Sequence, residues 1–265
     1  MKLSKIKNIQ ITNTGALILF TSKYVFKFPI NKMGYYTISQ EKYSYMKAKQ
    51  DVFFMNNILP SGSFITGIKT LRGNPIKKTE ELVRIDDYIL EKLRYSKKYP
   101  FVSAEKIIDY SYIHILINYN VEKLIQNYLK KIYIPNTPAH GDLHIGNLLM
   151  NNGEIAIIDW GGYKKNSSFC FDAFHYYVRY YSKSRNKSWV DVIFSEFSIS
   201  KEAVILSKIA GQDIETLSIA YAINRASLEI EQFGDIKKLK HNQKKKYVKI
   251  IELCQKKIIE SSNDV

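Results

Sequence analysis

A short segment in the middle of the chain concentrates side chains that could handle phosphate and a metal ion. It reads HGDLHIGN over residues 140–147 and, after a turn, IIDWG over residues 157–161. Mg²⁺ prefers oxygen ligands and takes one or two protein carboxylates together with phosphates and water. A further carboxylate could accept the proton of a hydroxyl group. These residue types therefore suit phosphoryl transfer to a hydroxyl, in which metal ions neutralise the transferring group.

The spacing of three polar residues supports this chemistry. Asn147 follows Asp142 by five positions, and Asp159 stands further along the chain, directly before Trp160-Gly161. In the kinase pattern H-x-D-x-x-x-x-N, the Asp is the base and the Asn holds metal, and a later D-F-G Asp holds metal too. Apolar runs on both sides of the turn at residues 151–153 predict two short buried strands joined by a hairpin. Such a hairpin could bring the three side chains to one end.

These motifs resemble a known group of proteins. HGDLHIGNLL followed by IIDWG is similar to the aminoglycoside phosphotransferase and choline kinase superfamily, whose members share the protein-kinase fold. The resemblance implies that Asp142 is the catalytic base and that Asn147 and Asp159 bind Mg²⁺. The alternative is a polar loop that merely joins two strands, because Asp, Asn and Gly are common in turns. A chance match to the whole set of residues at fixed spacing is improbable.

Three further residues take supporting roles in the same resemblance. His140 and His144 would organise the catalytic loop, although His144 is equally typical of a structural loop histidine. The superfamily often has an Asp at the head of the following helix, and Asp172 fits that place. We expect Asp172 to cap the helix and to brace the loop.

The N-terminal part supplies candidates for nucleotide binding. A kinase fold needs a strand Lys for the α- and β-phosphates and a helix Glu to pair with it. Lys27 is the one cation flanked on both sides by apolar strand residues, and Glu41 is the only acidic residue between Lys27 and Asp51. The alternatives are a solvated Lys and a Glu favoured near a helix N-terminus by the helix dipole.

Contacts to phosphate and purine are less clearly marked. No G-x-G-x-x-G sequence occurs, and residues 13–15 (Asn-Thr-Gly) are the only candidate for a phosphate-covering turn. Its backbone N–H groups and the hydroxyls of Thr12 or Thr14 could contact phosphate, although an ordinary hairpin turn explains it as well. By position and resemblance, the backbone groups of Glu91 and Leu93 would bind the purine of ATP, or of GTP.

The pattern along the chain predicts an α+β, bilobal, protein-kinase-like fold. The expected lobes are a β-rich nucleotide-binding lobe with one main helix, residues 1–92, and a mostly helical catalytic and acceptor-binding lobe, residues 93–265. We expect strands at residues 9–12, 16–20, 24–28, 63–71 and 82–93. We expect helices at residues 36–57 and 103–131, a strand–loop–strand unit at 140–159, and helices from about residue 171 onward.

Composition narrows the class of protein and its partners. The 265 residues are 45% hydrophobic and contain no apolar run long enough to span a membrane or act as a leader, so we expect a cytoplasmic protein. The net charge of +15 favours anionic partners such as nucleotides, phosphorylated glycans or an anionic membrane surface. The two cysteines cannot form a disulfide framework or a four-ligand zinc site, which indicates free thiols.

The acceptor is expected to be a small molecule or a glycan with a free hydroxyl. Only ten residues separate Gly161 from Asp172, too few for the activation segment that a protein kinase needs. A cationic acceptor would require carboxylates, and the only obvious cluster is Glu229, Glu231 and Asp235. Residues 161–265 nevertheless contain 18 Lys and Arg against 12 Asp and Glu, which argues against such an acceptor.

Other acceptors and other functions remain open from the sequence. A choline-like acceptor would need an aromatic cage, although core packing explains the available side chains as well. These side chains are Tyr176, Tyr177, Tyr180, Tyr181 and Trp189. A neutral or anionic sugar suits the charge best, including a lipid-linked or surface-polysaccharide sugar at the inner face of the membrane.

The basic stretch 237–259 reads as an amphipathic helix that either closes the second lobe or contacts a membrane surface. A non-catalytic nucleotide-binding pseudokinase is a further alternative, although the complete residue set argues against it. A nucleic-acid-binding module is disfavoured because no motif accompanies the charge.

Overall fold

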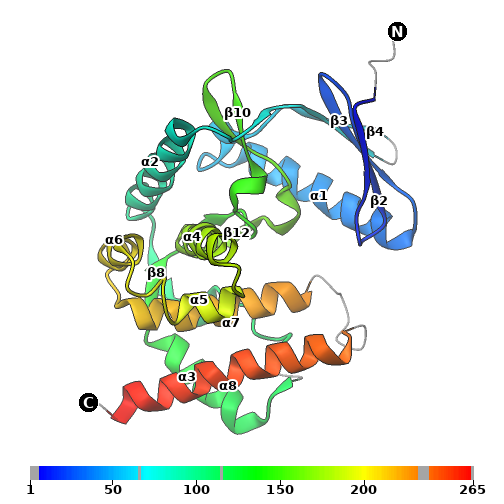
Figure 1. Cartoon of the computed structure of the whole chain (residues 1–265). Helices are drawn as coiled ribbons and strands as arrows, with labels where there is room; N and C mark the ends of the chain where they lie inside the picture. The colour runs from blue at the N-terminus through cyan, green and yellow to red at the C-terminus, as the bar shows by residue number, and fades with distance from the viewer. Residues whose placement is uncertain (1–5, 65–66, 114–115, 232–238, 264–265) are drawn as a thin grey trace. The chain divides into compact units, whose positions relative to one another are not determined.

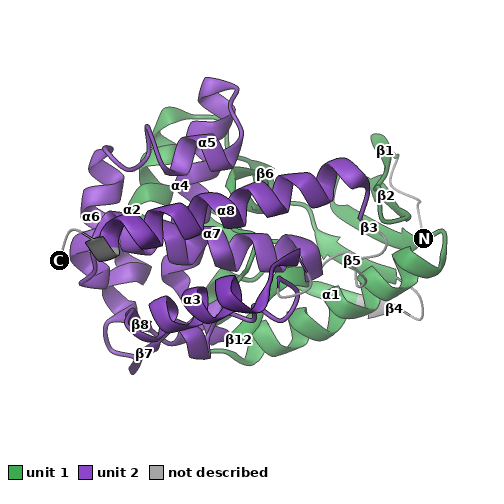
Figure 2. Ribbon diagram, turned by 90° about the horizontal axis from the view of Figure 1, so that it is seen from below, with its two compact units in different colours: residues 1–89, 140–165 green, residues 90–139, 166–265 purple. Residues whose placement is uncertain are grey.

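The computed structural model of the chain describes residues 6–64, 67–113, 116–231 and 239–263. The chain divides into two compact units (Figure 2), the first made of residues 1–89 and 140–165 and the second of residues 90–139 and 166–265. This grouping differs from the expected lobe boundary at residues 92 and 93, since it joins the segment 140–165 to the N-terminal part, and that boundary stays a prediction. Within the described ranges, every helix is too short or too polar to cross a membrane.

The first unit is built on a five-stranded antiparallel sheet (Figure 1) in the order β1-β2-β3-β5-β4. Its strands are β1 Asn8–Ile11, β2 Ala16–Phe20, β3 Tyr24–Pro29, β4 Ser61–Phe64 and β5 Gly67–Leu71. The three strands expected before residue 30 are confirmed. The single strand expected at residues 63–71 is instead a hairpin of two strands, in which Ser61 pairs with Thr70 and Phe64 with Gly67.

One long helix, α1 (Lys32–Gln50), packs on this sheet. Asn31 begins the helix because its side chain accepts a hydrogen bond from the Gly34 backbone N–H at 2.8 Å. The helix ends at Asp51, which has extended backbone, and a short 3-10 turn follows at Met55–Asn57. The helix therefore begins and ends earlier than the range 36–57 expected from the absence of Gly and Pro.

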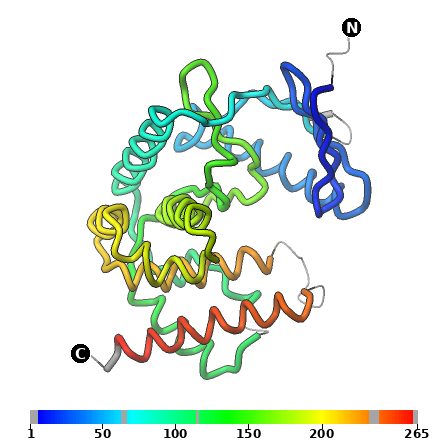
Figure 3. Tube along the Cα trace, viewed as in Figure 1, coloured from blue at the N-terminus to red at the C-terminus, as the bar shows by residue number. Residues whose placement is uncertain are grey.

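The hairpin expected from the central motif is confirmed. Strand β10 (Leu148–Asn151) pairs antiparallel with β11 (Glu154–Ile157), and Leu148 lies opposite Ile157. Two positive-φ residues, Asn152 and Gly153, form the tight turn between them. The short strand β6 (Asn74–Pro75) pairs with β10 from the other side, and Figure 3 shows its segment passing beside the green hairpin.

The strand expected at residues 82–93 is wrong: these residues belong to helix α2 (Thr79–Ser96). Ile85, Ile89 and Leu93 are each fully or almost fully buried, and their spacing of four places them on one helix face. The Glu81 carboxylate accepts hydrogen bonds from the backbone N–H groups of Lys77 and Lys78, so the N-terminal end of the helix is stabilised by a negative charge. The run resembles a strand in sequence because it is also rich in Leu and Ile.

The second unit is mostly helical, as expected. Its helices are α3 Tyr119–Lys130, α4 Phe169–Arg185, α5 Trp189–Ile193, α6 Lys201–Ala210, α7 Ile214–Glu231 and α8 His241–Asn263. Its short strands β7 (Phe101–Ser103) and β8 (Tyr133–Pro135) pair with each other, and β9 (Thr137–Ala139) follows β8. The helix expected over residues 103–131 is thus confined to α3, because β7 and a 3-10 turn occupy the start of that range. Strand β12 (Lys164–Ser167) precedes α4.

Helices α4 and α7 supply most of the core of the second unit. Nearly all of α4 between Phe169 and Val178 is buried, and so is most of α7 between Leu217 and Ile230. The two cysteines lie in this unit as buried free thiols, as expected. Burial raises the pKa of the Cys170 thiol to about 11 and that of Cys254 to about 12, so neither is ionised at neutral pH.

Candidate active site

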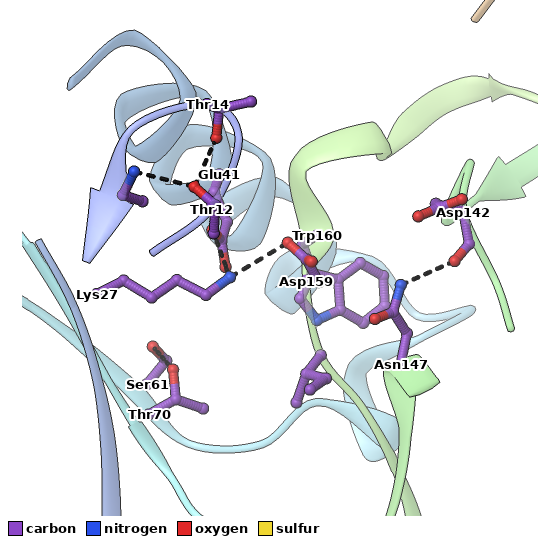
Figure 4. Close-up of polar contacts among 12 residues, drawn as sticks. Thr12, Thr14, Lys27, Glu41, Ser61, Thr70, Asp142, Asn147, Asp159 and Trp160 are labelled. Atoms are coloured by element: carbon purple, nitrogen blue, oxygen red, sulfur yellow. Dashed lines mark hydrogen bonds and ion pairs between the residues drawn. The ribbon is translucent and has the colours of Figure 1, made fainter. Parts of the chain in front are cut away.

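An ion cluster joins strand β3, helix α1 and the end of β11. The Lys27 Nζ donates to the Glu41 carboxylate at 2.8 and 2.9 Å and to the Asp159 Oδ1 at 3.2 Å. Side chains alternate along a strand, and this alternation turns Lys27 toward α1. Figure 4 shows Lys27 extending between the two carboxylates, all three within the first unit. The structure thus brings together a strand cation, a helix carboxylate and the carboxylate of the Asp-Trp-Gly segment.

Opposite charges act against burial in this cluster. Burial disfavours the ammonium form of Lys27, but Asp159 and Glu41 outweigh this effect and raise the pKa of Lys27 above its ordinary value. Burial also pushes the pKa of the Glu41 carboxyl upward, whereas Lys27 opposes that shift. Both Glu41 oxygens accept hydrogen bonds from the same ammonium group, and this geometry favours the charged pair.

Asp159 differs from Glu41 in backbone and in exposure. Its backbone is left-handed, with φ 64° and ψ 59°, a conformation that costs a residue with a side chain about 1–2 kcal/mol. Its side chain is 51% exposed, compared with 11% for Glu41. Such strain persists where the surrounding structure imposes it, and it is common at functional sites. The Asp159 carboxylate therefore retains access to solvent while one oxygen contacts Lys27.

The loop that carries Asp142 is held by a close approach of two backbone segments. Gly141 has φ 81°, and a Cβ atom there would lie 2.3 Å from the Gly162 carbonyl oxygen. A Cβ on Gly162 would lie 3.0 Å from the His140 carbonyl oxygen. Only glycine fits at position 141, because both the positive φ and the contact exclude a side chain. The Asp142 loop and the segment after Asp159 are therefore packed backbone to backbone.

His140 connects the same two segments through its ring. Its Nε2 lies 2.9 Å from the Ile158 carbonyl oxygen, which can only accept, and its Nδ1 accepts from the Asp142 N–H at 3.3 Å. These partners assign a neutral ring with the proton on Nε2. Complete burial lowers the pKa of His140, which is consistent with the neutral form. The ring also packs edge-on against Trp160, with centroids 4.9 Å apart.

Asn147 and His144 shape the turn after Asp142. The Asn147 Nδ2 donates to the Asp142 carbonyl oxygen at 2.9 Å, so the amide orientation is set and its Oδ1 is left as a potential ligand. His144 caps the 3-10 turn Ile145–Asn147, since its Nδ1 accepts from the Gly146 N–H at 3.0 Å. The His144 Nε2 lies 3.7 Å from the Asp142 Oδ2. Both residues thus contact the loop that presents the Asp142 carboxylate.

The oxygens of Asn147 and Asp159 suit Mg²⁺, which prefers hard oxygen donors and few protein carboxylates. Among the described residues, no group of three or more His, Cys, Asp or Glu side chains could hold a metal ion by itself. An ion held by Asn147 and Asp159 would need further oxygens, and the phosphates of a nucleotide supply these. The donor set therefore fits a metal that arrives with a nucleotide.

The turn expected to cover phosphate is a braced hairpin. The Thr12 and Thr14 hydroxyls lie 2.9 Å apart, and the Thr12 hydroxyl accepts from the Ala16 N–H at 2.9 Å. Gly15 has φ 81° and lies so close to the start of α1 that a Cβ on Gly34 would be 1.9 Å from the Gly15 carbonyl oxygen. The Thr hydroxyls are thus engaged with the turn itself, and contact of this turn with phosphate stays a prediction.

Two sequence assignments need correction. Glu91 and Leu93 lie within α2, where backbone groups are used by the helix itself, so they do not form an extended hinge for a purine. Leu93 is also buried, and its carbonyl oxygen accepts from the Ser96 hydroxyl. Asp172 is not the cap of its helix. Ser168 caps α4 by accepting from the Cys170 N–H, and Asp172 lies buried in the first turn.

Sequence reasoning missed several neighbours of the site. The Tyr163 hydroxyl donates to the Asp51 Oδ2 at 2.8 Å and links the segment after Asp159 to the end of α1. The Ser61 and Thr70 hydroxyls lie 3.1 Å apart, and Figure 4 shows them near Lys27. Isolated Tyr, Ser and Thr residues carry no spacing signal. The glycines of the motif were only a weak indication that the backbones at Gly141 and Gly162 lie close together.

Several of the side chains considered for acceptor binding make contacts within the second unit or are buried in it. Glu229 accepts from the Arg225 Nε at 3.0 Å, the Lys246 Nζ at 2.9 Å and the Tyr247 hydroxyl at 3.1 Å. Tyr176, Tyr177 and Trp189 are buried, whereas Tyr180 is 49% exposed. Asp235 lies outside the described residues. Neither a set of open carboxylates nor an open aromatic cage is present among these described side chains.

Part of the chain matches a known protein family, and the fold is similar to solved structures. Residues 119–181, which include the Asp142 loop and Asp159, match the profile of the phosphotransferase enzyme family. No curated protein sequence matches the chain. The choline kinase LicA from Streptococcus pneumoniae is similar in structure, with a TM-score of 0.55 and 14% identity over 97% of this chain and 94% of the other.

A second similar structure is a thermostable mutant of aminoglycoside phosphotransferase APH(4)-Ia in a ternary complex with ADP and hygromycin B. It has a TM-score of 0.54 and 10% identity over 96% of this chain and 95% of the other. Identities this low establish the fold and not the substrate. The resemblance to the aminoglycoside phosphotransferase and choline kinase superfamily is confirmed, and the chain has that superfamily's protein-kinase-like fold.

Proposed function

We propose that the chain is an ATP-dependent phosphotransferase that moves the γ-phosphoryl group to a hydroxyl of a small molecule or a sugar. The family match and the kinase-like neighbours support a small-molecule phosphotransferase. The observation that carries the proposal is the ion cluster in which Lys27 contacts both Glu41 and Asp159. It combines a phosphate-binding cation with a partly exposed carboxylate in the unit that also holds Asp142.

Each residue of the site has a role in this reaction. Asp142 takes the proton of the acceptor hydroxyl as its oxygen forms a bond to the γ-phosphorus, and the bond from that phosphorus to the bridging oxygen breaks to release ADP. Lys27 binds phosphate oxygens, and Glu41 keeps its ammonium group in place. Asn147 and Asp159 would hold Mg²⁺, which neutralises phosphate charge when bound. His140 and His144 orient the loop that presents Asp142.

The purine contact is reassigned from Glu91 and Leu93 to the segment after β5. Residues 72–75 lead from the sheet that carries Lys27 to the β10 hairpin, and Asn74 and Pro75 pair with Met150 and Leu149. A Cβ on Gly73 would lie 2.8 Å from the Leu149 Cβ, so this backbone runs directly against the hairpin. An extended backbone there can offer N–H and C=O groups to a purine edge, whereas the interior of a helix cannot.

The test is Mg²⁺-dependent ATP consumption across a panel of acceptors: aminoglycosides, choline, ethanolamine, simple sugars, heptoses and glycan fragments. We expect turnover with one acceptor class and a loss of about 10³-fold in kcat for Asp142→Asn, because the variant lacks the base. Nucleotide affinity should be unchanged in that variant. The matched control is Asp87→Asn, at an exposed position of α2.

Three outcomes separate the alternatives. Binding of Mg·ATP without turnover of any acceptor, including lipid-linked glycans, would identify a pseudokinase. Equal turnover by Asp142→Asn and the wild type would refute the role of Asp142. Absence of nucleotide binding would refute the phosphotransferase itself.

A further inference from the structure

The sheet of the first unit has an apolar face on the side opposite helix α1. Lys27 reaches Glu41 of α1, so the residues that alternate with Lys27 along β3 point the other way. The strand registers extend this face across the sheet, because Ile9 pairs with Leu19 and Leu19 with Phe26, and Ile11 pairs with Leu17 and Leu17 with Phe28. We call it the outer sheet face, and its apolar members are Ile9, Ile11, Leu17, Leu19, Tyr24, Phe26, Phe28 and Leu71.

Within the described part of the first unit, α1 is the only helix that packs on β2, β3 and β5, and it packs on their other side (Figure 1). On the outer sheet face, Ile9 is 57% and Ile11 67% exposed. Antiparallel sheets with one solvated face ordinarily carry polar residues on that face. Here the outer face is apolar as well: its β2 and β3 side chains are partly buried, whereas Ile9 and Ile11 are exposed. An apolar surface that is open to solvent can mark a site of interaction.

Lysines surround this face, and acidic residues are absent from the segments that build it. Residues 6–30 and 60–71 contain no Asp or Glu. The Lys69 Nζ lies 3.9 Å from the Tyr24 ring centroid and 6.0 Å from that of Phe26, and the Lys23 Nζ lies 5.6 Å from Tyr24. The ammonium groups of Lys69 and Lys23 thus lie over aromatic rings of the outer sheet face, in the geometry of cation–π contacts. Lys7 is exposed and follows the same alternation as Ile9.

We propose that the outer sheet face binds the surface of an anionic lipid bilayer. Aromatic and aliphatic side chains would enter the headgroup region, and Lys7, Lys23 and Lys69 would contact lipid phosphates. Charge complementarity selects this occupant, because the segments that build the face supply cations and no carboxylate. The proposal is independent of the phosphotransferase reaction, although it would bring an enzyme of this class to lipid-linked acceptors.

Helix α8, the other candidate from the sequence, fits a membrane less well. Most of its apolar residues are turned inward, and Tyr247, Ile250, Ile251, Cys254 and Ile258 are all buried, whereas Ile259 is 45% exposed. Its exposed positions include Glu252 and Glu260 as well as lysines. Helix α8 therefore closes the core of the second unit with a solvated charged side, and the outer sheet face is the better membrane contact.

The test is co-sedimentation of the full chain with vesicles of phosphatidylcholine alone and of phosphatidylcholine containing about a third phosphatidylglycerol. We expect binding to the anionic vesicles that weakens with salt, and little binding to the neutral ones. The double variant Ile9→Asn/Ile11→Asn should lower the partition coefficient at least about tenfold, because two aliphatic side chains no longer insert. Lys7→Glu/Lys23→Glu should lower it by a similar factor.

Matched controls address folding and the competing surface. Ile199→Asn/Val204→Asn replaces two exposed aliphatic residues of the second unit and should leave binding unchanged. Lys245→Glu/Lys249→Glu reverses two exposed charges of α8 and should lower binding much less than Lys7→Glu/Lys23→Glu. Thermal unfolding of each variant verifies that the fold is intact, since all the substituted residues are exposed.

Four results would overturn the proposal. They are equal binding to neutral and anionic vesicles, absence of vesicle binding, a larger loss from the α8 variant than from the sheet variants, and a dimer by light scattering that Ile9→Asn/Ile11→Asn converts to monomer. The last would identify the face as a contact between copies of the chain. Vesicle binding and ATP turnover are separate readouts, so failure of either proposal leaves the other testable.

Discussion

Among the described residues, each unit contains an ion cluster around one largely buried group, and the two clusters are built in opposite ways. In the first unit, one cation, Lys27, contacts the carboxylates of Glu41 and Asp159. In the second, one carboxylate, Glu229, contacts the cations of Arg225 and Lys246 and also the Tyr247 hydroxyl. The first cluster has an excess of negative charge and the second an excess of positive charge.

The difference separates a cluster suited to chemistry from one suited to stability. Asp159 is half exposed and has a strained backbone, and its charge raises the pKa of neighbouring Glu41 after the larger effect of burial. Glu229 is 15% exposed. Burial alone would raise its pKa, but Arg225 and Lys246 outweigh burial and hold the pKa below its ordinary value. Glu229 has its charge compensated within the unit, whereas Asp159 keeps access for a further cation.

The same comparison bears on the acceptor. Glu229 was one of the carboxylates that could have attracted a cationic acceptor, and its interactions are taken up by three side chains of its own unit. Lys246 also lies 5.8 Å from the Trp189 ring centroid and 5.1 Å from that of Tyr247. A lysine of this chain thus makes a cation–π contact with Trp189, one of the aromatic residues considered for a choline-like acceptor. These contacts favour a neutral or anionic acceptor in the proposed reaction.

The largest effect is expected where the first cluster loses its exposed carboxylate. Asp159→Asn should lower kcat by about 10³-fold, because the carboxylate proposed to hold Mg²⁺ is lost. Its melting temperature should equal or exceed that of the wild type, since Glu41 no longer faces a like charge and strained functional residues often cost stability. Steady-state kinetics and thermal unfolding measure the two effects. A marked loss of stability would remove the distinction between the clusters.

The reciprocal change in the second cluster should affect stability and not chemistry. Glu229→Gln leaves Arg225 and Lys246 without their counter-charge, which should cost about 3 kcal/mol of unfolding free energy. For a chain of this size the melting temperature should fall by roughly 6–12 °C. The kcat of the folded variant should stay within about twofold of the wild type. The control Glu252→Gln changes an exposed α8 carboxylate and should leave both quantities unchanged.

The candidate site and the Glu229 cluster should also respond to acid in different pH ranges. Glu229 has a lowered pKa, so its contribution is complete above pH 4.5 and is lost as the pH falls further. His140, which connects the two segments of the candidate site, has a pKa lowered from 6.5 by burial. Because the unfolded chain binds a proton at His140 that the native chain does not, stability should already decrease as the pH falls below 6.5.

A His140→Asn variant isolates this second contribution. The wild type should lose up to about 1.4 kcal/mol of unfolding free energy per pH unit below pH 6.5 through this group, and the variant should lack that slope even though it is less stable at neutral pH. Urea unfolding at several pH values between pH 7 and pH 5 measures the slope of unfolding free energy against pH. His241→Asn, at an exposed position, should retain the wild-type slope. An identical slope in both variants would show that His140 does not titrate as proposed.

The smallest effect is expected at the link between the Asp159 segment and α1. Tyr163→Phe removes the 2.8 Å hydrogen bond to Asp51 while it keeps the ring, and should cost about 1 kcal/mol of unfolding free energy. The kcat should fall only a few-fold, because Lys27 and Glu41 still hold Asp159 and α1 together. Chemical denaturation and kinetics measure both. A fall in kcat as large as that of Asp159→Asn would mean that the hydrogen bond, and not the ion cluster, positions the carboxylate.

Much of the first unit could be predicted because its signals are local. The strands before residue 30 follow from β-rich runs divided by turn residues, and the hairpin after Asn147 follows from two apolar runs around Asn152 and Gly153. The strand expected at residues 82–93 was wrong. This segment has high β-propensity, but Ile85, Ile89 and Leu93 are spaced four residues apart, which is the repeat of one helix face. The backbone contact to the purine was assigned to residues of this expected strand, so the wrong secondary structure also made the assignment of Glu91 wrong.

The residues of the central motif could be predicted more directly from the sequence than the Lys27–Glu41 pair. Asp142, Asn147 and Asp159 stand in one stretch with fixed spacing, so the motif alone identifies them as candidates. Lys27 and Glu41 were chosen by elimination, and folding brings them to 2.8 Å. The N-cap of α4 was misassigned to Asp172. The N-cap is Ser168, which lies in a segment with several residues that could cap a helix. Tyr163 and Asp51 are far apart in sequence, and no periodicity relates them.

The sequence by itself determined the residue types of the catalytic loop, their spacing and the excess of positive charge. Only the tertiary structure decided which charges meet. Lys27 and Asp159 stand 132 positions apart, yet share a hydrogen bond, and Glu229 is compensated by a lysine of the next helix. Likewise, only the strand registers show that Ile9, Leu19 and Phe26 form one apolar face. Spacing reports which side of an element a residue occupies, whereas ion pairing and burial depend on distances between elements that folding alone sets.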